Sequence, residues 1–380
     1  MNLLHFDVEG GWGGSSISLL EIVKKLKHTN NKSLIVCRKE GPIQKKYKNE
    51  NIKYFLEKNL YSFIPRKNGK NFKNFIGSLT QLIFFPLGIL NIIKIIKKYK
   101  IDILHINYEG FFLLGLILKF FTKKPIIFHI RTQFPEKNLA CKIIVYLITK
   151  YIADYIFFIS DKEKFFFKKY DTKSKIPKKI LFNISSFKPL SQNKLIKIIS
   201  YFGNISYEKG VDRIINVAKI CKEKKMKYEF QIFGKLNKKG YGRDYYLKLK
   251  KIIKENKLTN IRLMGHVSNP EIYLSKSYLQ IRLARTNDPY GRDIIEALTM
   301  GVPSLATGTY EGIIKNNFNG YLLKTFSTDK IIFLLDRLSK NNHERNRLSK
   351  NCIKVKHLFD GTNQIELFEK AIKFAGNRIR

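Results

Sequence analysis

Short runs of apolar residues alternate with segments of helical periodicity over most of the chain. Within residues 1–160 these runs are MNLLHF, SLIVC, DILHI, PIIFHI and YIFFIS. Continuous apolar strands separated by helices are typical of a parallel sheet that is covered on both faces. The alternation therefore predicts an α/β domain with a doubly wound parallel sheet in the first part of the sequence.

The alternation is interrupted once and then resumes, which predicts a second domain of the same class. Between Ser174 and Leu195 the sequence mixes proline, serine and asparagine, and the runs LIKIISYFG, YEFQIFG, IRLMG, YLQIRLA and PSLAT follow. The length of 380 residues also suits two domains of roughly 100–200 residues each. We expect one domain at residues 1–185, a second at 186–360, and a C-terminal helix at 361–380 that returns to the first domain.

The composition is that of a folded and strongly basic protein. Hydrophobic residues make up 44% of the chain, and 72 lysines and arginines against 30 acids give a net charge of +42. The excess is spread evenly over both halves of the sequence. Such a charge suits nucleic acid, anionic lipid headgroups or phosphorylated substrates, and a bias that merely places lysines on the surface explains it equally well.

The cysteines and the N-terminus indicate the compartment. Cys37, Cys141, Cys221 and Cys352 lie far apart, without a C-x-x-C or a Cys/His cluster at metal spacing. We therefore expect a reduced, cytoplasmic protein without a zinc site. The first residues lack the basic and apolar regions of a signal peptide, so none is expected.

Two apolar stretches bear on contact with a membrane. Leu82–Ile93 and Gly110–Phe121 are both shorter than the roughly 20 residues that a spanning helix needs. We expect buried helices at both places. Because Lys94, Lys97 and Lys98 flank the first stretch, we also expect a peripheral contact with an anionic membrane at its inner face.

A glycine-rich loop follows the first predicted strand. Ligands of doubly wound sheets bind at the carboxyl ends of strands, and the loop EGGWGGSS, residues 9–16, lies there and leads into a helix. Glycines let the backbone approach a ligand and the helix start offers N–H groups to an anion, so Gly13 and Gly14 are candidate binding residues. The spacing is not G-x-G-x-x-G, which disfavours a dinucleotide. Trp12 either stacks on a sugar or seals the loop.

Two histidines end predicted strands of the first domain. His105 in DILHI and His129 in PIIFHI are placed to donate to or polarise a ligand hydroxyl, although a hydrogen-bonded core histidine is an equal alternative. Arg131 and Gln133 follow His129 and suit a core poorly. We therefore favour His129.

Three predicted strands of the second domain end in glycine. A lysine turn follows the first of them, with Lys209 before a helix, and this arrangement aims an ammonium group at a diphosphate. Two later strands end at Gly234 and just before His266 and Val267. Main-chain groups at these two ends are candidates for reading a nucleobase edge.

The segment DPYGRDIIEALTMG gathers acids at a predicted helix start. Asp288 lies in the turn that leads into a helix near Arg292, and Glu296 lies about one turn inside it. A carboxylate so placed suits the two hydroxyls of a ribose, while the helix N-terminus suits a diphosphate and Asp288 reaches the attached sugar. The helix dipole explains Asp293 sufficiently.

These residues carry a family resemblance. DPYGRDIIEALTMGVPSLAT is similar to the E-x7-E signature of retaining glycosyltransferases of family 4, within glycosyl transferases group 1, and EKGVDRII resembles the lysine motif of that family. ILFNISSF and NNFNGYLL extend the likeness along the chain. The resemblance implies the GT-B fold, in which two Rossmann-like domains face each other across a cleft and bind the acceptor and the nucleotide sugar respectively.

The resemblance also implies roles. Among the catalytic residues it implies, Glu296 binds the ribose and Lys209 binds the diphosphate. Asp288 binds the donor sugar, and His129 contacts a sugar hydroxyl. The implied nucleotide-sugar-binding set is Gly13, Gly14, Asn204, Lys209, Gly234, His266, Val267, Tyr290, Gly291 and Glu296. Members of the family need no metal, and this chain has no D-x-D motif, so we expect neither a metal nor a cofactor.

Two departures from the family pattern concern the donor. The first signature acid is Asp288 instead of Glu, a shorter reach that bears on sugar preference. Asn204 stands where members commonly have a phosphate-binding arginine, and Arg131, Arg213 and Arg285 are alternative replacements for its charge.

The expected function is that of a retaining, metal-independent hexosyltransferase. It would move a sugar from a nucleotide-sugar donor to a glycan acceptor, lipid-linked, in the synthesis of a bacterial surface polysaccharide such as capsule, O-antigen or exopolysaccharide. A nucleotide-sugar epimerase of the same fold is the alternative. A basic nucleic-acid-binding protein is a weaker one, because no nucleic-acid module is recognisable and the lysines are spread evenly.

Overall fold

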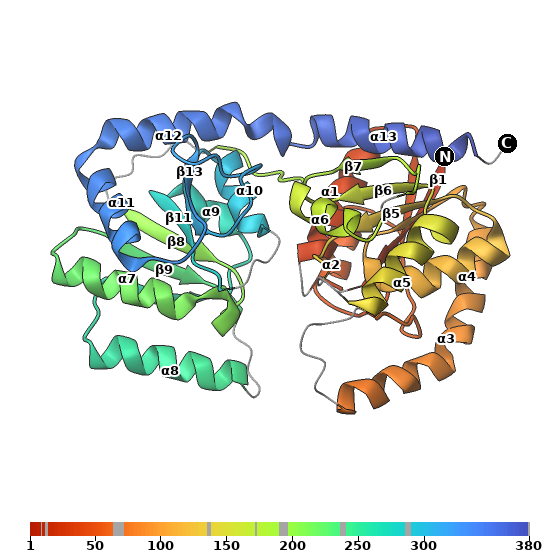
Figure 1. The fold of residues 1–380 in the computed structure, drawn as a ribbon, viewed down its shortest axis with the longest axis horizontal. Helices are drawn as coiled ribbons and strands as arrows, with labels where there is room; N and C mark the ends of the chain where they lie inside the picture. The colour runs from red at the N-terminus through yellow and green to blue at the C-terminus, as the bar shows by residue number, and fades with distance from the viewer. Residues whose placement is uncertain are drawn as a thin grey trace. The chain divides into compact units, whose positions relative to one another are not determined.

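The structure is a computed structural model that describes residues 1–8, 10–11, 14–63, 72–134, 138–171, 173–189, 197–235, 241–285 and 290–378, of which 72–80 and 241 by their backbone alone. Close contacts divide the chain into two compact units (Figure 1). The first unit comprises Met1–Ile184 and Gly361–Arg380, and the second comprises Ser185–Asp360. These limits lie within one residue of the domain limits expected from the sequence.

The first unit is built on a seven-stranded parallel sheet. Its strands, in spatial order, are β3 (Tyr54–Leu56), β2 (Lys32–Cys37), β1 (Asn2–Asp7), β4 (Ile103–Ile106), β5 (Ile126–Ile130), β6 (Tyr155–Phe158) and β7 (Lys178–Ile180). The strand order reverses between β1 and β4, as in a doubly wound sheet. The central strands are buried along almost their whole length, which explains their continuous apolar sequence.

Helices cover both faces of this sheet. They are α1 (Gly14–Leu26), α2 (Ile43–Asn49), α3 (Phe72–Lys98), η1 (Glu109–Phe111), α4 (Phe112–Thr122), α5 (Leu139–Leu147), η2 (Ile148–Ile152), α6 (Asp161–Lys168) and α13 (Thr362–Gly376). The core on one face joins the sheet to α3, α4 and α5, and the cores on the other face join it to α1, α2 and α13. Helix α13 thus helps to cover a sheet whose strand β1 comes from the first residues of the sequence (Figure 1).

The second unit repeats the strand order with a six-stranded parallel sheet. Its strands, in spatial order, are β10 (Ile261–Gly265), β9 (Glu229–Phe233), β8 (Ile198–Phe202), β11 (Leu279–Arg282), β12 (Ser304–Thr307) and β13 (Gly320–Leu323). Its helices are η3 (Tyr207–Lys209), α7 (Val211–Glu223), α8 (Tyr241–Glu255), α9 (Pro270–Ser275), α10 (Arg292–Thr299), α11 (Thr328–Lys340), α12 (Asn342–Lys354) and η4 (Lys356–Leu358). The order reverses between β8 and β11, which makes their carboxyl ends the expected ligand site.

The two apolar stretches form helices that are not fully buried. Leu82–Ile93 lies within α3, where Ile83 and Leu87 are exposed, so the prediction of a buried helix is wrong for the outer side of α3. Gly110–Phe121 forms η1 and most of α4, with Phe120 and Phe121 exposed. Among the described residues no helix is long and apolar enough to cross a membrane.

Candidate functional site

Three glycines lie at the carboxyl ends of adjacent strands in the second unit. Gly203 follows β8, Gly234 follows β9, and Gly265 ends β10. The Gly203 amide donates to the carbonyl of Phe233 at 3.0 Å, and the Gly234 amide donates to the carbonyl of Gly265 at 2.8 Å. A Cβ atom on Gly234 would lie 1.9 Å from the Gly203 oxygen, so only glycine fits there. This edge is therefore formed by closely packed main chain.

The lysine turn between β8 and α7 lies beside these glycines. Asn204 is exposed, Lys209 is half-buried at the end of η3, and Gly210 adopts φ +69 before α7 begins. A Cβ on Gly210 would lie 1.9 Å from the carbonyl oxygen of Leu283, just beyond β11. The lysine turn is thus pressed against the end of the neighbouring strand, which fixes the backbone that carries Lys209.

Arg285 holds this turn from the β11 side. Its guanidinium stacks on the Tyr207 ring at 3.7 Å and donates from Nη1 to the Tyr207 carbonyl at 2.7 Å, while its amide donates to the Glu208 carbonyl at 2.8 Å. The same guanidinium binds both oxygens of Asp212. Burial raises the pKa of Asp212, but hydrogen bonds from Arg285 and Tyr245 outweigh it and lower that pKa overall. Sequence reasoning missed this pair, since Arg285 and Asp212 are 73 residues apart.

The arginines proposed to replace the missing family arginine are all engaged. Arg285 is neutralised by Asp212, and Arg213 donates to the Ala284 carbonyl at 3.2 Å and stacks on Phe326. Arg131 lies in the first unit and is bonded to other side chains there. Their charges are committed to internal contacts in this structure, and none of them is singled out as the replacement.

Helix α10 begins at the carboxyl end of β11 and carries Glu296. The Glu296 carboxylate accepts from Arg292 Nη2 at 3.0 Å, and both side chains are mostly buried, at 15% and 14% exposure. Gly291 caps the helix, and a Cβ on it would lie 1.9 Å from Asp293 Oδ1. The neighbouring Tyr290 is buried. Glu296 therefore lies one turn into α10, at the depth expected from the sequence.

Asp293 fixes the first turn of α10 to the sheet. Its carboxylate accepts from Arg282 Nη1 at 3.0 Å and from Gln280 Nε2 at 2.7 Å, and all three residues are buried. The helix dipole alone is therefore an incomplete account of this acid. A buried ion pair in which each carboxylate oxygen accepts a hydrogen bond holds the helix start where β11 ends.

The remaining candidates of the second unit lie around the same edge. His266 is exposed, and Val267 packs on a small apolar cluster that includes the stacked rings of Phe202 and Phe233. Asp288, the first signature acid, lies outside the described residues. Lys209 and Glu296 follow β8 and β11, so the structure brings their segments to neighbouring strand ends.

In the first unit close packing explains two of the glycines in the loop after β1. A Cβ on Gly10 would lie 2.5 Å from the Lys39 oxygen, and one on Gly11 would lie 2.8 Å from Ile43. Gly14 begins α1 and is exposed, whereas Gly13 and Trp12 lie outside the described residues.

His129 lies inside the first unit. Its side chain is 1% exposed, its ring lies 6.0 Å from Phe157 and 5.9 Å from His105, and its Nδ1 is 3.4 Å from Arg131 Nη2. Burial, with smaller contributions from Arg131 and His105, holds the pKa of His129 well below its ordinary value, so the ring is neutral. Its Nε2 is buried without a hydrogen-bond partner among the described residues. His105 Nδ1 lies 2.9 Å from His5 Nδ1, a partner that sequence reasoning did not consider.

Arg131 organises the carboxyl ends of β4 and β5. It donates from Nη2 to Asn107 Oδ1 at 2.6 Å and from Nη1 to Asn183 Oδ1 at 2.9 Å, while its amide donates to Glu109 Oε2 at 2.9 Å. Asn107 also donates to the Ser15 carbonyl at the start of α1, at 3.3 Å. The position of Asn107 directly after an apolar strand was the available signal for this cluster.

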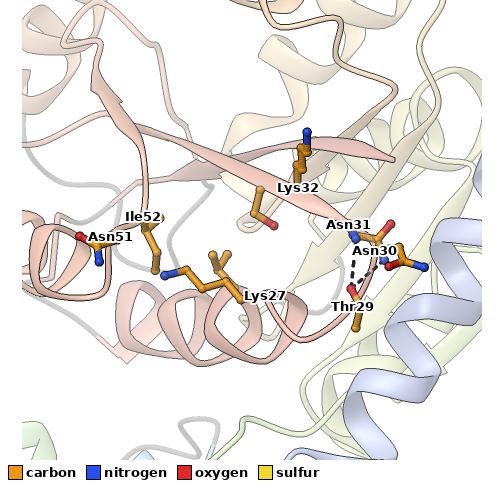
Figure 2. A pocket seen from close by; sticks show the side chains of 9 residues that line it. Lys27, Thr29, Asn30, Asn31, Lys32, Asn51 and Ile52 are labelled. Carbon is orange, nitrogen blue, oxygen red and sulfur yellow. Dashed lines mark hydrogen bonds between the residues drawn. The ribbon is translucent and has the colours of Figure 1, made fainter.

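A surface pocket of about 470 Å³ lies away from these strand ends (Figure 2). It is lined at the amino end of β2 by Val23, Lys27, Thr29, Asn30, Asn31, Lys32, Ser33, Asn51 and Ile52. Asn31 donates from Nδ2 to Thr29 Oγ1 at 3.0 Å, so these polar groups satisfy one another. None of the predicted site residues lines this pocket.

No metal centre is present in the described part of the chain. No three His, Cys, Asp or Glu side chains group there as metal ligands. The four cysteines are buried free thiols.

Comparisons with known proteins agree with the fold of both units. Residues 183–355 match the family model described as Glycosyl transferases group 1. Over 138 residues the chain is 28% identical to the poly(glycerol-phosphate) alpha-glucosyltransferase of Bacillus subtilis (strain 168), a match that covers 35% of this chain and 20% of that protein. The match thus spans about a fifth of that curated relative.

Solved structures resemble the whole chain. The Anabaena Alr3699/HepE structure in complex with UDP and glucose superposes with a TM-score of 0.79 at 16% identity, covering 98% of this chain and 99% of that one. A glycosyltransferase from Rickettsia africae ESF-5 gives a TM-score of 0.77 at 16% identity, covering 100% and 98%. With its two doubly wound units, the chain has the GT-B fold.

Proposed function

Because residues 183–355 match the family model of glycosyl transferases group 1, we propose that this chain transfers a hexose from a nucleotide-sugar donor to a glycan acceptor with retention of configuration. The observation that carries the proposal is the placement of a lysine turn and an acid-bearing helix start at the ends of the neighbouring strands β8 and β11. An ammonium group and helix amides suit a diphosphate, and a carboxylate suits the hydroxyls of a ribose.

Glu296 is assigned the ribose. Its carboxylate is held by Arg292 Nη2 at 3.0 Å, and a carboxylate can accept from the vicinal hydroxyls of a ribose. The contact with Arg292 fixes the rotamer of Glu296 before the donor arrives, which lowers the entropy lost on binding.

Lys209 and the start of α10 are assigned the diphosphate. The departing nucleoside diphosphate gains negative charge as the bond to the anomeric carbon breaks, and preorganised positive groups stabilise that charge most in the transition state. Arg285, which is itself held by Asp212, keeps the lysine turn in place through hydrogen bonds to its backbone carbonyls. With this charge supplied by the protein, transfer is proposed to need neither a metal nor a cofactor.

The nucleobase and the sugar are assigned to the surrounding loops. Main chain at Gly234, together with His266, Val267 and Asn204, is proposed to contact the base and the adjoining phosphate. The donor sugar is assigned to Asp288 and to the amides of Tyr290 and Gly291.

The first unit is proposed to supply the acceptor site and the remaining donor contacts. His129 is assigned a donor-sugar hydroxyl, which a neutral imidazole with an unpartnered Nε2 can bind. Gly13 and Gly14 are proposed to approach the donor by their backbone. The acceptor hydroxyl then attacks the face from which the diphosphate leaves.

The acceptor is proposed to be a lipid-linked glycan of a bacterial surface polysaccharide, elongated in the cytoplasm at the inner face of the membrane. The curated relative, named for glucosyl transfer to poly(glycerol-phosphate), supports a polymeric acceptor. Capsule, O-antigen and exopolysaccharide are the polymer classes to be compared.

A panel of nucleotide sugars tests the proposal. We expect one donor to raise the melting temperature and to release nucleoside diphosphate, in the presence of EDTA as well as in its absence. Product analysis separates the alternatives: an epimerase would convert the donor without an acceptor, and a nucleic-acid binder would retain RNA on a filter in a salt-dependent manner without responding to any donor. Either result would reject the proposed transfer.

A further inference from the structure

Exposed apolar side chains gather on the helices that cover one face of the first unit's sheet. On this face α3, α4 and α5 pack their inner sides against Leu4, Phe6 and other residues of the strands. Their outer sides have no neighbouring layer within the described part of this unit. The character of those outer sides therefore indicates what they contact.

Helix α3 has two contrasting sides. The inner residues are buried, and they are Phe85, Ile89, Ile92 and Ile96. The outer residues Ile83, Leu87 and Leu90 are 70%, 54% and 55% exposed. At 100° per residue the two sets lie on opposite sides of the helix. An apolar row on the outer side is not explained by packing against the described residues of the unit.

Lysines continue the outer row of α3. Lys94 lies one turn after Leu90, and Lys97 and Lys98 complete the last turn, all three with exposed side chains. The outer side of α3 thus changes from apolar to cationic along its length.

The neighbouring helices repeat this combination. At the end of α4, Phe120 and Phe121 are 69% and 65% exposed, and Lys123 Nζ lies 5.4 Å from the centre of the Phe120 ring. On α5, Leu139 and Ile143 are exposed as well. Each of the three helices contributes exposed apolar side chains to the same layer.

The charge of these helices is of one sign. The sequences of α3, FKNFIGSLTQLIFFPLGILNIIKIIKK, of α4, FLLGLILKFFT, and of α5, LACKIIVYL, contain lysines and no acidic residue. Apolar side chains bordered by lysines suit the boundary between acyl chains and anionic headgroups. A conventional protein interface would be poorer in lysine than this one.

We propose that the outer side of α3, with the exposed ends of α4 and α5, binds the surface of an anionic lipid bilayer. Ile83, Leu87 and Leu90 enter the acyl boundary, and Lys94, Lys97 and Lys98 bind the headgroup phosphates. The proposal rests on the surface of the first unit alone and holds whether or not the proposed sugar transfer is correct.

Co-sedimentation of the full chain with vesicles tests this surface. Vesicles of phosphatidylcholine with phosphatidylglycerol are expected to bind the protein, while vesicles of phosphatidylcholine alone leave it in solution. Binding should weaken as salt is added, since the lysine contribution is screened over roughly 10 Å at about 0.1 M ionic strength.

Two triple variants divide the surface into its parts. Ile83→Ser/Leu87→Ser/Leu90→Ser removes the apolar row, and Lys94→Gln/Lys97→Gln/Lys98→Gln removes the charge. Each is expected to lower vesicle affinity by about tenfold or more. All six side chains are exposed, so both variants should fold, which circular dichroism verifies. Phe333→Ser, at an exposed apolar residue on α11 of the second unit, is the matched control and should bind like the parent.

Three results would overturn the proposal. The parent chain stays in solution with anionic vesicles, both triple variants bind as tightly as the parent, or the Phe333→Ser control loses as much affinity as they do. A dimer in sedimentation velocity that the apolar triple variant abolishes, without any vesicle binding, would assign the surface to a second copy of this chain instead.

Discussion

The carboxyl edges of the two sheets share one topology and differ in how they hold their charged groups. In the second unit Lys209 is half-buried and the Glu296 side chain keeps 15% of its surface exposed, and both lie on segments that Arg285, Asp293 and packed glycines fix in place. In the first unit His129 and Arg131 are 1% and 6% exposed, and the Arg131 guanidinium donates hydrogen bonds to side chains within the unit. The same strand order thus produces one edge that presents charge and another that encloses it.

This difference indicates where binding energy is available. A charged group that is held by its neighbours but reaches solvent can exchange water for a ligand at little cost in entropy. A buried and bonded group must first lose an internal contact. We therefore expect changes at the second edge to affect the donor, and changes at the first edge to affect folding more than donor affinity.

Glu296→Ala should have the largest effect. Loss of the ribose contact is expected to reduce kcat/KM for the donor by about 100-fold or more, roughly 3 kcal/mol, while the melting temperature changes little. Steady-state kinetics and nucleotide titration measure it. Glu271→Ala, at an acid in the first turn of α9, is the control and should stay within about twofold of the parent. An unchanged donor kcat/KM in Glu296→Ala would remove the ribose assignment.

Acidification should destabilise the first unit more than the second. Burial lowers the pKa of His5 to about 3, and holds the pKa values of His105 and His129 well below their ordinary 6.5. Below about pH 6.5 these three histidines are protonated in the unfolded chain but stay neutral in the native first unit. The stability due to these neutral histidines is therefore complete above about pH 6.5 and is lost as the pH falls below it, by about 1.4 kcal/mol per pH unit for each.

Hydrogen exchange measures this effect region by region, after correction for the intrinsic pH dependence of exchange. The second unit's described histidines, His266, His343 and His357, are all exposed. Between about pH 7.5 and pH 5.5 the core strands β1, β4 and β5 should lose more protection than β8 and β11. Equal losses in the two sheets would contradict this account of the buried histidines.

Gly234→Ala sharpens the role of the packed main chain. Its new Cβ would meet the Gly203 oxygen at 1.9 Å, so β8 and β9 must separate at their ends, at a cost of about 1–3 kcal/mol. The Cβ of Gly265→Ala would have no neighbour within 4 Å. This variant should therefore lose only the roughly 1 kcal/mol that a left-handed backbone costs a residue other than glycine. Urea unfolding compares the two. A larger loss for Gly265→Ala would show that contact with Gly203 is not what requires glycine.

Arg285→Lys should have the smallest of these effects. Lysine keeps the charge but loses the planar fork that holds Asp212 and the stack on Tyr207. The lysine turn is then less well ordered, and kcat/KM for the donor should fall about tenfold. Arg262→Lys on β10, an exposed arginine, serves as the control. Identical kinetics in the two variants would mean that Arg285 does not position Lys209.

The sequence sufficed for features that depend on local periodicity. Apolar runs located the strands, the strand end at Gly203 located the Lys209 turn, and the turn sequence before Arg292 located the start of α10. These features are local because a strand end, a cap and a helix turn involve neighbouring residues.

Partners distant in the chain were not predictable from spacing. The bonds of Arg285 to Asp212, Arg282 to Asp293, and Arg131 to Asn183 depend on which strands become neighbours. The sequence shows that α3 is apolar, but it does not show which of its apolar side chains are exposed. Their exposure depends on the layers that pack around the helix. The return of the C-terminal helix to the first unit was expected, but for the same reason its contacts with His5 and His105 were not.

That cover has a consequence for synthesis. Phe368 of α13 stacks on Phe157 and abuts His105, so one face of the first sheet lacks part of its cover until residues up to Gly376 have left the ribosome. The strands that are made first therefore gain this cover only after the whole second unit has been synthesised, and the first unit is expected to reach its protected state later than its place in the chain suggests.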